Sequence, residues 1–263
     1  MRSLPSITRR QLRLFAVLCL AISWGLWLAV GLTGGDVRES PTIWLFAIGA
    51  SGPSLAALVA FLVLRRGEIP RARVAAPWVW LPLALVLGAL PAVASSLILE
   101  PGSFGSAAPG VVAGSGGVLL FIVTYLIAGP LAEEFGWRGY LQPRLRQRFG
   151  IIATSLVIGI AWAIWHVPLF FLNGTGQAAM GFGSLRSLLF FAGMIPLSAT
   201  YLFVSERLAG RVWSAILLHF AGNAALSLFP QTSDAAALLH FFLTTAIAIG
   251  SLLVWWALDR RSR

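Results

Sequence analysis

The chain is a series of long apolar segments separated by short polar connections. All but one of the apolar segments have close to the roughly 20 residues that a helix needs to cross a bilayer, and several connections contain turn residues such as Gly34-Gly35 and Pro101-Gly102. This pattern predicts an all-α polytopic membrane protein with a single integral-membrane domain, residues 1–263. Eight transmembrane helices are expected, at residues 12–32, 42–64, 77–99, 112–146, 151–172, 186–206, 211–229 and 235–258.

The fourth expected helix, 112–146, is far longer than a bilayer requires. The pair Gly129-Pro130 lies in its middle, and such a pair is expected to kink or break a membrane helix. A kink at this point would turn Glu133 and Glu134 toward the interior of the bundle. The sequence therefore predicts a long, kinked fourth helix.

Composition supports a membrane protein. Of 263 residues, 58% are hydrophobic and 11% are charged, compared with about 25% charged residues in a typical soluble domain. The first apolar run, 12–32, is long enough to span the membrane, so we do not interpret it as a cleaved signal peptide. The single cysteine, Cys19, excludes an intramolecular disulfide and a multi-cysteine metal site, and its apolar surroundings indicate a buried structural thiol.

The net charge of +10 comes from 19 arginines and no lysine, which raises the possibility of nucleic-acid binding. If the chain crosses the membrane eight times, the connections on one side contain Arg2, Arg9, Arg10, Arg13, Arg65, Arg66, Arg71, Arg73, Arg144, Arg146, Arg148, Arg207, Arg211, Arg260, Arg261 and Arg263. The opposite connections contain only Arg38 and Arg186. The positive-inside rule then places both termini on the cytoplasmic side of a bacterial plasma membrane. The arginines would contact anionic lipid headgroups rather than nucleic acid.

Three ionisable residues interrupt the fourth helix: Glu133, Glu134 and Arg138. Each costs roughly 2.5–3.5 kcal/mol at the centre of a bilayer on insertion scales, so the group indicates a functional site. Residues i and i+4 share a helix face, so Glu134 can pair with Arg138. Glu133 has no partner on its own helix and is suited to accept a proton as a general base. A purely structural ion-pair network is the alternative.

Two further polar pairs with helical spacing lie in apolar helices: Trp162 with His166, and His219 with Asn223. At about 1.5 Å per residue, Glu133 lies roughly 16 Å from Arg144, His166 roughly 23 Å from Ile151, and His219 roughly 12 Å from Arg211. These depths are similar enough for the three clusters to share one cavity. Either histidine could instead bond a neighbouring carbonyl and only tighten helix packing.

Taken together, the three clusters resemble those of a known family. The segment Glu133-Glu134-Phe-Gly-Trp-Arg138 is similar to an EExxxR motif, Trp162-x-x-x-His166 to a second motif in which phenylalanine usually comes first, and His219-x-x-x-Asn223 to an HxxxN motif. They follow one another in the order found in the CPBP intramembrane proteases, also called the Abi or type II CAAX endopeptidase family. The resemblance covers residues of about 115–230, and an eight-span topology fits it.

The resemblance implies specific roles. Glu133 would activate a water molecule together with His166, while His219 and Asn223 would stabilise the oxyanion. Arg138 and Glu134 would hold the geometry of the site. The family is commonly described as metalloproteases, and Glu133, His166 and His219 are the candidate ligands of a divalent metal such as zinc. Direct activation of water by glutamate and histidine needs no ion, so both possibilities remain open.

We therefore expect an intramembrane endopeptidase that hydrolyses peptide bonds of membrane-associated peptides or proteins. CAAX cleavage is taken as a family label, because a bacterial protein would not be expected to meet prenylated substrates. The alternatives are a non-catalytic membrane scaffold or bacteriocin-immunity protein of the same fold, and a proton-coupled transporter. A transporter would be expected to show repeats with broken helices in both halves, and no convincing repeat is visible.

Overall fold

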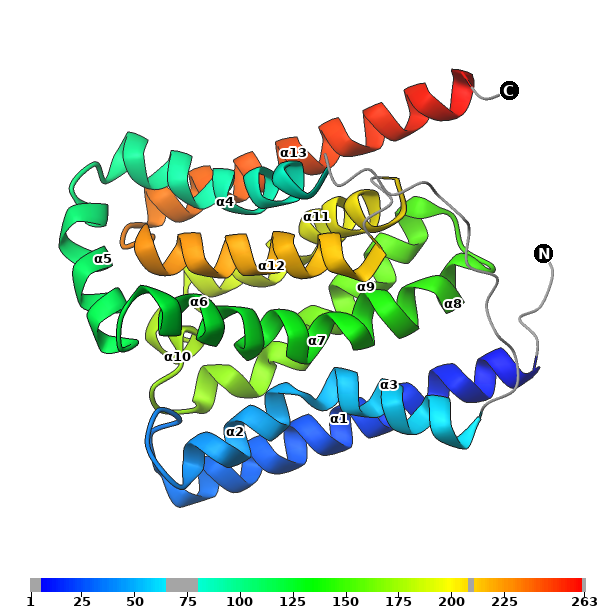
Figure 1. Ribbon diagram of the computed structural model, residues 1–263, viewed down its shortest axis with the longest axis horizontal. Helices are drawn as coiled ribbons and strands as arrows, with labels where there is room; N and C mark the ends of the chain where they lie inside the picture. The colour runs from blue at the N-terminus through cyan, green and yellow to red at the C-terminus, as the bar shows by residue number, and fades with distance from the viewer. Residues whose placement is uncertain (1–5, 65–79, 208–210, 262–263) are drawn as a thin grey trace.

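The computed structural model describes residues 6–64, 80–207 and 211–261, and within these ranges all regular structure is helical (Figure 1). The elements are, in chain order, α1 (Ser6–Thr33), α2 (Thr42–Ala50), α3 (Gly52–Val63), α4 (Trp80–Leu99), α5 (Ser103–Gly114), α6 (Val118–Leu126), η1 (Ile127–Leu131), α7 (Ala132–Glu134), η2 (Phe135–Leu141), α8 (Gln142–Arg146), α9 (Ile151–His166), η3 (Val167–Phe171), α10 (Gly176–Met180), α11 (Leu185–Glu206), α12 (Arg211–Leu228) and α13 (Asp234–Arg261). The all-α fold expected from the sequence is confirmed.

The number of membrane spans differs from the expected eight. Among the described residues, six helical segments are long and apolar enough to cross a membrane, or seven if α2 and α3 form one bent span. These two helices meet at an angle of 56°, at the Ser51-Gly52-Pro53 turn. Helix α12 is not among the six, because His219, Asn223 and Arg211 make it less apolar than its neighbours. The count of eight is therefore not confirmed.

The fourth expected helix begins later than residue 112. Residues 103–114 form a separate helix, α5, which the hydropathy pattern did not reveal. Gly116 and Gly117 have positive φ angles of 86° and 106°, a conformation that glycine adopts without a steric penalty. The long helical segment starts after this turn and covers Val118–Arg146. The start of the expected third helix, residues 77–79, and the arginines of the connection 65–79 lie outside the described residues.

The long helices run roughly along one bundle axis, α5 lies across one end, and the start of α1 and the end of α13 lie at the other end (Figure 1). Helix α4 packs along α12, and α11 packs between α9 and α13. Two glycines set how closely these pairs approach. A Cβ on Gly88 of α4 would lie 2.2 Å from the main-chain oxygen of Leu218 in α12. A Cβ on Gly159 of α9 would lie 2.7 Å from Cα of Ile195 in α11. Small residues permit this backbone-to-backbone packing in membrane bundles.

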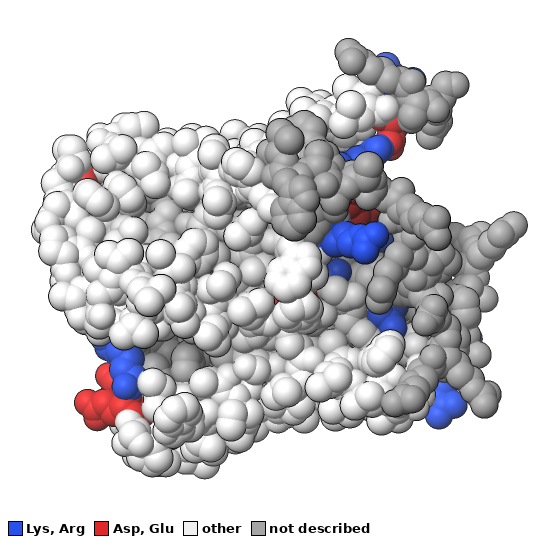
Figure 2. All heavy atoms as spheres, viewed as in Figure 1, with Lys and Arg blue, Asp and Glu red and all other residues white. Residues whose placement is uncertain are grey.

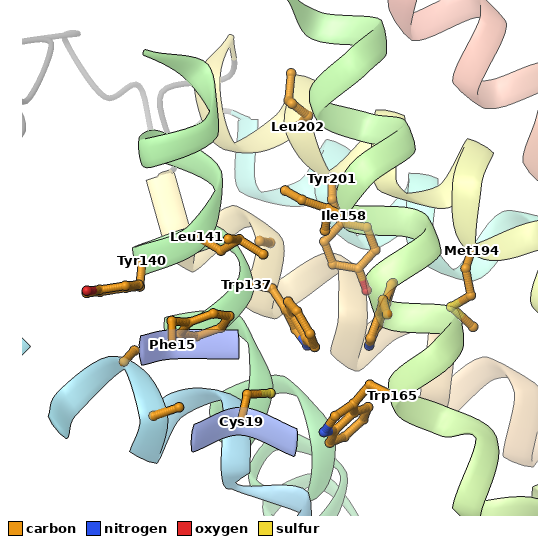
Figure 3. Packing of buried hydrophobic residues seen from close by; sticks show 14 of the residues in the cluster. Phe15, Cys19, Trp137, Tyr140, Leu141, Ile158, Trp165, Met194, Tyr201 and Leu202 are labelled. Carbon is orange, nitrogen blue, oxygen red and sulfur yellow. The ribbon is translucent and has the colours of Figure 1, made fainter. Parts of the chain in front are cut away.

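The buried core lies where α1, η2, α9 and α11 meet (Figure 3). Phe15 and Cys19 of α1 face Trp137 and Tyr140 of η2, and Phe15 stacks on Tyr140 at 5.4 Å between ring centroids. Cys19 is buried, as expected for a structural thiol. This core fixes η2, and therefore Arg138, against the rest of the bundle.

The visible surface is largely uncharged between the two ends of the bundle (Figure 2). Many large apolar side chains of the described helices are exposed, for example Leu119, Ile152 and Leu188. A broad apolar belt is what contact with lipid chains requires. The protein is therefore an integral membrane protein, while the expected cytoplasmic position of its termini remains a prediction.

At one end of the bundle, Glu100 ties the end of α4 to the start of α13. Its carboxylate accepts hydrogen bonds from the main-chain N–H of Ser233 at 2.6 Å and of Thr232 at 3.1 Å, and from the Thr232 hydroxyl at 2.9 Å. Burial raises the pKa of Glu100, but these hydrogen bonds to the charged form outweigh burial, so its pKa lies below the ordinary 4.5.

Candidate active site

A sharp kink places the two glutamates inside the bundle. Ala128 has ψ 94°, and Gly129 has φ 110° and ψ −79°, so both residues are non-helical. Pro130 follows, which removes one main-chain donor at the break. The kink expected at Gly129-Pro130 is present. Beyond it the helix resumes, and Glu133 and Glu134 are buried, with exposed fractions of 5% and 0%.

Three polar atoms from two segments converge beside Gly129. A Cβ built on this glycine would lie 3.0 Å from Asn223 Nδ2, 3.4 Å from His219 Nε2 and 3.6 Å from Glu133 Oε1. No two of these atoms can therefore be farther apart than about 7 Å, the sum of the two longer distances. The absent side chain of Gly129 leaves a small cradle bordered by a carboxylate oxygen, an imidazole nitrogen and an amide nitrogen.

Glu134 links its own helix to α12. Its Oε1 accepts a hydrogen bond from Arg138 Nη1 at 3.1 Å and one from His219 Nδ1 at 2.8 Å. The pairing of Glu134 with Arg138 expected from their spacing is confirmed. Because Nδ1 of His219 donates to a carboxylate, Nε2 is the nitrogen that faces the cradle. The carboxylate fixes the orientation of this imidazole.

Arg138 lies between two aromatic rings. Its guanidinium carbon is 3.9 Å from the ring centroid of Tyr201 and 4.5 Å from that of Trp162. Cation–π contacts of this kind stabilise a desolvated guanidinium. Tyr201 of α11 is a residue that the sequence analysis missed, because a lone tyrosine in an apolar helix carries no spacing signal.

Trp162 connects the remaining two residues of the site. Its indole Nε1 donates a hydrogen bond to Glu133 Oε2 at 2.7 Å, and its main-chain oxygen accepts one from His166 Nδ1 at 2.8 Å. Glu133 has no partner on its own helix, as its spacing indicated, but it does have this one from α9. The imidazole of His166 lies 5.7 Å from the Trp162 ring between centroids, and that of His219 lies 5.6 Å from it. The structure thus places Glu133, Glu134, Arg138, His219 and Asn223 together and joins His166 to them through Trp162.

The same group of residues includes the candidate ligands of a metal ion, Glu133, His166 and His219. In residues 6–64, 80–207 and 211–261, no three His, Cys, Asp or Glu side chains are gathered as the ligands of a metal ion would be. Nδ1 of His219 is hydrogen-bonded to Glu134 and Nδ1 of His166 to the Trp162 carbonyl, so a metal would have to bind Nε2 of either ring. As they lie in the structure, the described residues do not form a gathered three-ligand site for the metal that the resemblance allows.

The fold and the site define a helical integral-membrane protein with a carboxylate, an imidazole and an amide gathered in its interior. Residues 115–225 match the family described as "Type II CAAX prenyl endopeptidase Rce1-like". The "CAAX prenyl protease 2" of Methanococcus maripaludis is 30% identical over 114 residues, which are 43% of this chain and 42% of that protein. The resemblance carried by the three motifs is confirmed: the segment that contains them is similar to the CPBP family of intramembrane proteases. The match covers about two fifths of the curated relative's length.

Proposed function

We propose that this protein is an intramembrane endopeptidase that hydrolyses a peptide bond with a water molecule activated by Glu133. The observation that carries the proposal is the meeting of Glu133 Oε1, His219 Nε2 and Asn223 Nδ2 around Gly129. Hydrolysis of an amide needs a base beside a water molecule and a donor beside the developing oxyanion. The cradle offers both within a few ångströms.

Glu133 acts as the general base. Its Oε1 borders the cradle while Oε2 is held by Trp162. Oε1 takes a proton from water as the water oxygen bonds to the carbonyl carbon of the substrate. When the C–N bond breaks, the same proton passes to the leaving nitrogen, so the glutamate returns to its charged form.

Asn223 and His219 stabilise the tetrahedral intermediate. The Asn223 amide donates without adding charge to a water-poor cavity. His219 donates from Nε2 when its ring is protonated, and Glu134, bound to Nδ1, then supplies the opposite charge. Arg138 holds Glu134 in place through their shared hydrogen bond. His166, whose Nδ1 donates to the Trp162 carbonyl, has Nε2 available as an acceptor for a water proton.

The substrate is a membrane-associated peptide or protein segment. The site lies among apolar helices, so a substrate has to reach it from the bilayer or its surface. The name of the Methanococcus relative adds prenylated CAAX sequences to the classes that need testing.

The test is cleavage of fluorogenic peptides by the purified protein in lipid vesicles. One probe carries a farnesylated C-terminal CAAX sequence, and the other is an unlipidated transmembrane peptide. Glu133→Gln is expected to lower kcat by about 1,000-fold, the middle of the range for a general base. The control Glu206→Gln, at a partly exposed ion pair, is expected to stay within about twofold of wild type.

A chelator in the same assay separates the two ways of activating water. Since no step above uses a metal, turnover is expected to survive chelation. Loss of activity that zinc restores would contradict the metal-free mechanism. A wild-type protein that cleaves neither peptide would contradict the protease and favour a binding scaffold.

A further inference from the structure

Trp162 makes a polar contact that its place in an apolar helix did not suggest. The indole of this residue is 2% exposed, and its N–H meets Glu133 Oε2 at 2.7 Å. An indole nitrogen can only donate, and in a buried setting it needs an acceptor. Here the acceptor is the carboxylate that borders the cradle.

The indole cannot easily turn away from this contact. One ring neighbour is His219, with an interplanar angle of 74°, and another is Tyr201, with an angle of 79°. The guanidinium of Arg138 lies over the ring. Three segments, η2, α11 and α12, therefore enclose the indole and fix the direction of its N–H.

The hydrogen bond distinguishes the two oxygens of Glu133. Oε2 is bound to the indole, whereas Oε1 borders the cradle together with His219 and Asn223. A carboxylate without this contact could rotate about its last side-chain bond and exchange the two oxygens. A phenylalanine at position 162 would fill much of the same space but would have no donor.

We propose that Trp162 is a positioning residue that holds Oε2 of Glu133 so that Oε1 faces the water and the scissile carbonyl. The proposal rests on the hydrolytic function proposed above. Through its main-chain oxygen, the same residue also orients His166. One residue of α9 therefore sets the geometry of the base and of the second imidazole.

The test compares two tryptophan variants in the fluorogenic peptide assay. Trp162→Phe removes the N–H and keeps an aromatic ring, and we expect kcat to fall about 10-fold with KM unchanged, as for the loss of a hydrogen bond to a charged group. Trp137→Phe is the matched control, because Trp137 is similarly buried and its Nε1 has no hydrogen-bond partner among the residues that the structure describes. This control is expected to keep the kcat of wild type. Equal kcat values for the two variants would overturn the proposal.

A second measurement tests the contact without relying on turnover. In protein carrying ¹⁵N-labelled tryptophan, Glu133→Gln is expected to shift the indole resonance of Trp162 and to leave that of Trp137 in place. An unmoved Trp162 resonance would overturn the proposal even if the Trp162 variant does not fold.

The outcomes separate this proposal from the proposed function. If Glu133→Gln is inactive and Trp162→Phe retains full kcat, the protease stands and the positioning role fails. If Glu133→Gln retains full turnover, both fail.

Discussion

Two arginines of the long segment Val118–Arg146 form ion pairs with glutamates, and these two pairs are of equal length and different burial. Arg138 and Glu134 are 3.1 Å apart with side chains 1% and 0% exposed, whereas Arg146 and Glu206 are 3.1 Å apart with side chains 25% and 30% exposed. Distance alone would rank them as equivalent. Burial separates them, because a partly exposed pair is screened by water whereas a buried one must be fully compensated.

The neighbours of the two pairs differ as well. Glu206 is also bound by Gln142, and Arg146 also donates to the main-chain oxygen of Phe149, so this pair closes the end of the bundle. Glu134 instead binds His219, whose other nitrogen faces the cradle at Gly129. The buried pair is thus connected to groups that can meet a substrate, and the exposed pair is connected to helix ends.

Neutralising the glutamate of each pair tests this contrast most strongly. Glu134→Gln is expected to reduce the free energy of unfolding by about 3–5 kcal/mol, because it leaves the charge of Arg138 buried without compensation. Glu206→Gln is expected to reduce it by less than about 1 kcal/mol. Equilibrium unfolding in detergent measures both, and equal losses would show that burial does not distinguish the pairs.

Removal of the amide at the cradle is expected to affect chemistry rather than stability. Asn223→Ala should lower kcat by about 100-fold, the size of effect seen when one oxyanion donor is lost. Asn173→Ala is the control, since the Asn173 side chain donates to the Gly34 main-chain oxygen in an exposed connection. Steady-state kinetics with the cleaved peptide would show this, and a change confined to KM would argue against an oxyanion role.

Filling the cradle should also impair catalysis. Gly129→Ala places a methyl group 3.0 Å from Asn223 Nδ2 at a φ of 110°, so we expect kcat/KM to fall up to about 100-fold, as for a small displacement of reacting groups. Gly139→Ala provides the comparison, because its Cβ would meet only ordinary contacts of 3.7 Å or more. Should both variants retain full activity, the space beside Gly129 is not where the substrate reacts.

The smallest expected effect concerns Glu100, a carboxylate stabilised by hydroxyl and main-chain N–H groups. Its pKa is lower in the folded protein than the ordinary 4.5, so it adds stability above that pH and loses it as the pH falls through the folded value. Acid should therefore lower the unfolding midpoint of wild type more than that of Glu100→Gln. Parallel acid titrations monitored by circular dichroism test this, and identical slopes would contradict it.

Much of the fold could be predicted because hydropathy fixes where apolar helices lie along the chain. The kink followed from Gly129-Pro130, since that pair disrupts a helix wherever it occurs. Helix α5 was missed because residues 103–114 are rich in small residues and merge with the following apolar run. The 56° bend between α2 and α3 was also missed, because Gly52-Pro53 lies within an otherwise continuous apolar segment.

The candidate site could be predicted only where its contacts lie within one helix. Glu134 and Arg138 are four residues apart, and their pairing follows from helix geometry. The contacts of Glu134 with His219 and of Glu133 with Trp162 join different helices. They depend on how each helix is rotated about its axis, which apolar segments with uniform hydropathy do not specify.

The close approach at Gly88 and Gly159 has a mechanical consequence. Where the main chains of two helices touch with no side chain between them, a change of side-chain rotamers cannot accommodate a shift of one helix against the other. Gly88 therefore joins α4 and α12 into one rigid unit, and Gly159 joins α9 and α11 into another. A movement that admits a polypeptide is therefore expected to carry α4 with α12, and α9 with α11, leaving the connections between these units to flex. The imidazoles of His219 and His166 would then travel on separate bodies, and the gap between those bodies would set how far the two rings can separate during a catalytic cycle.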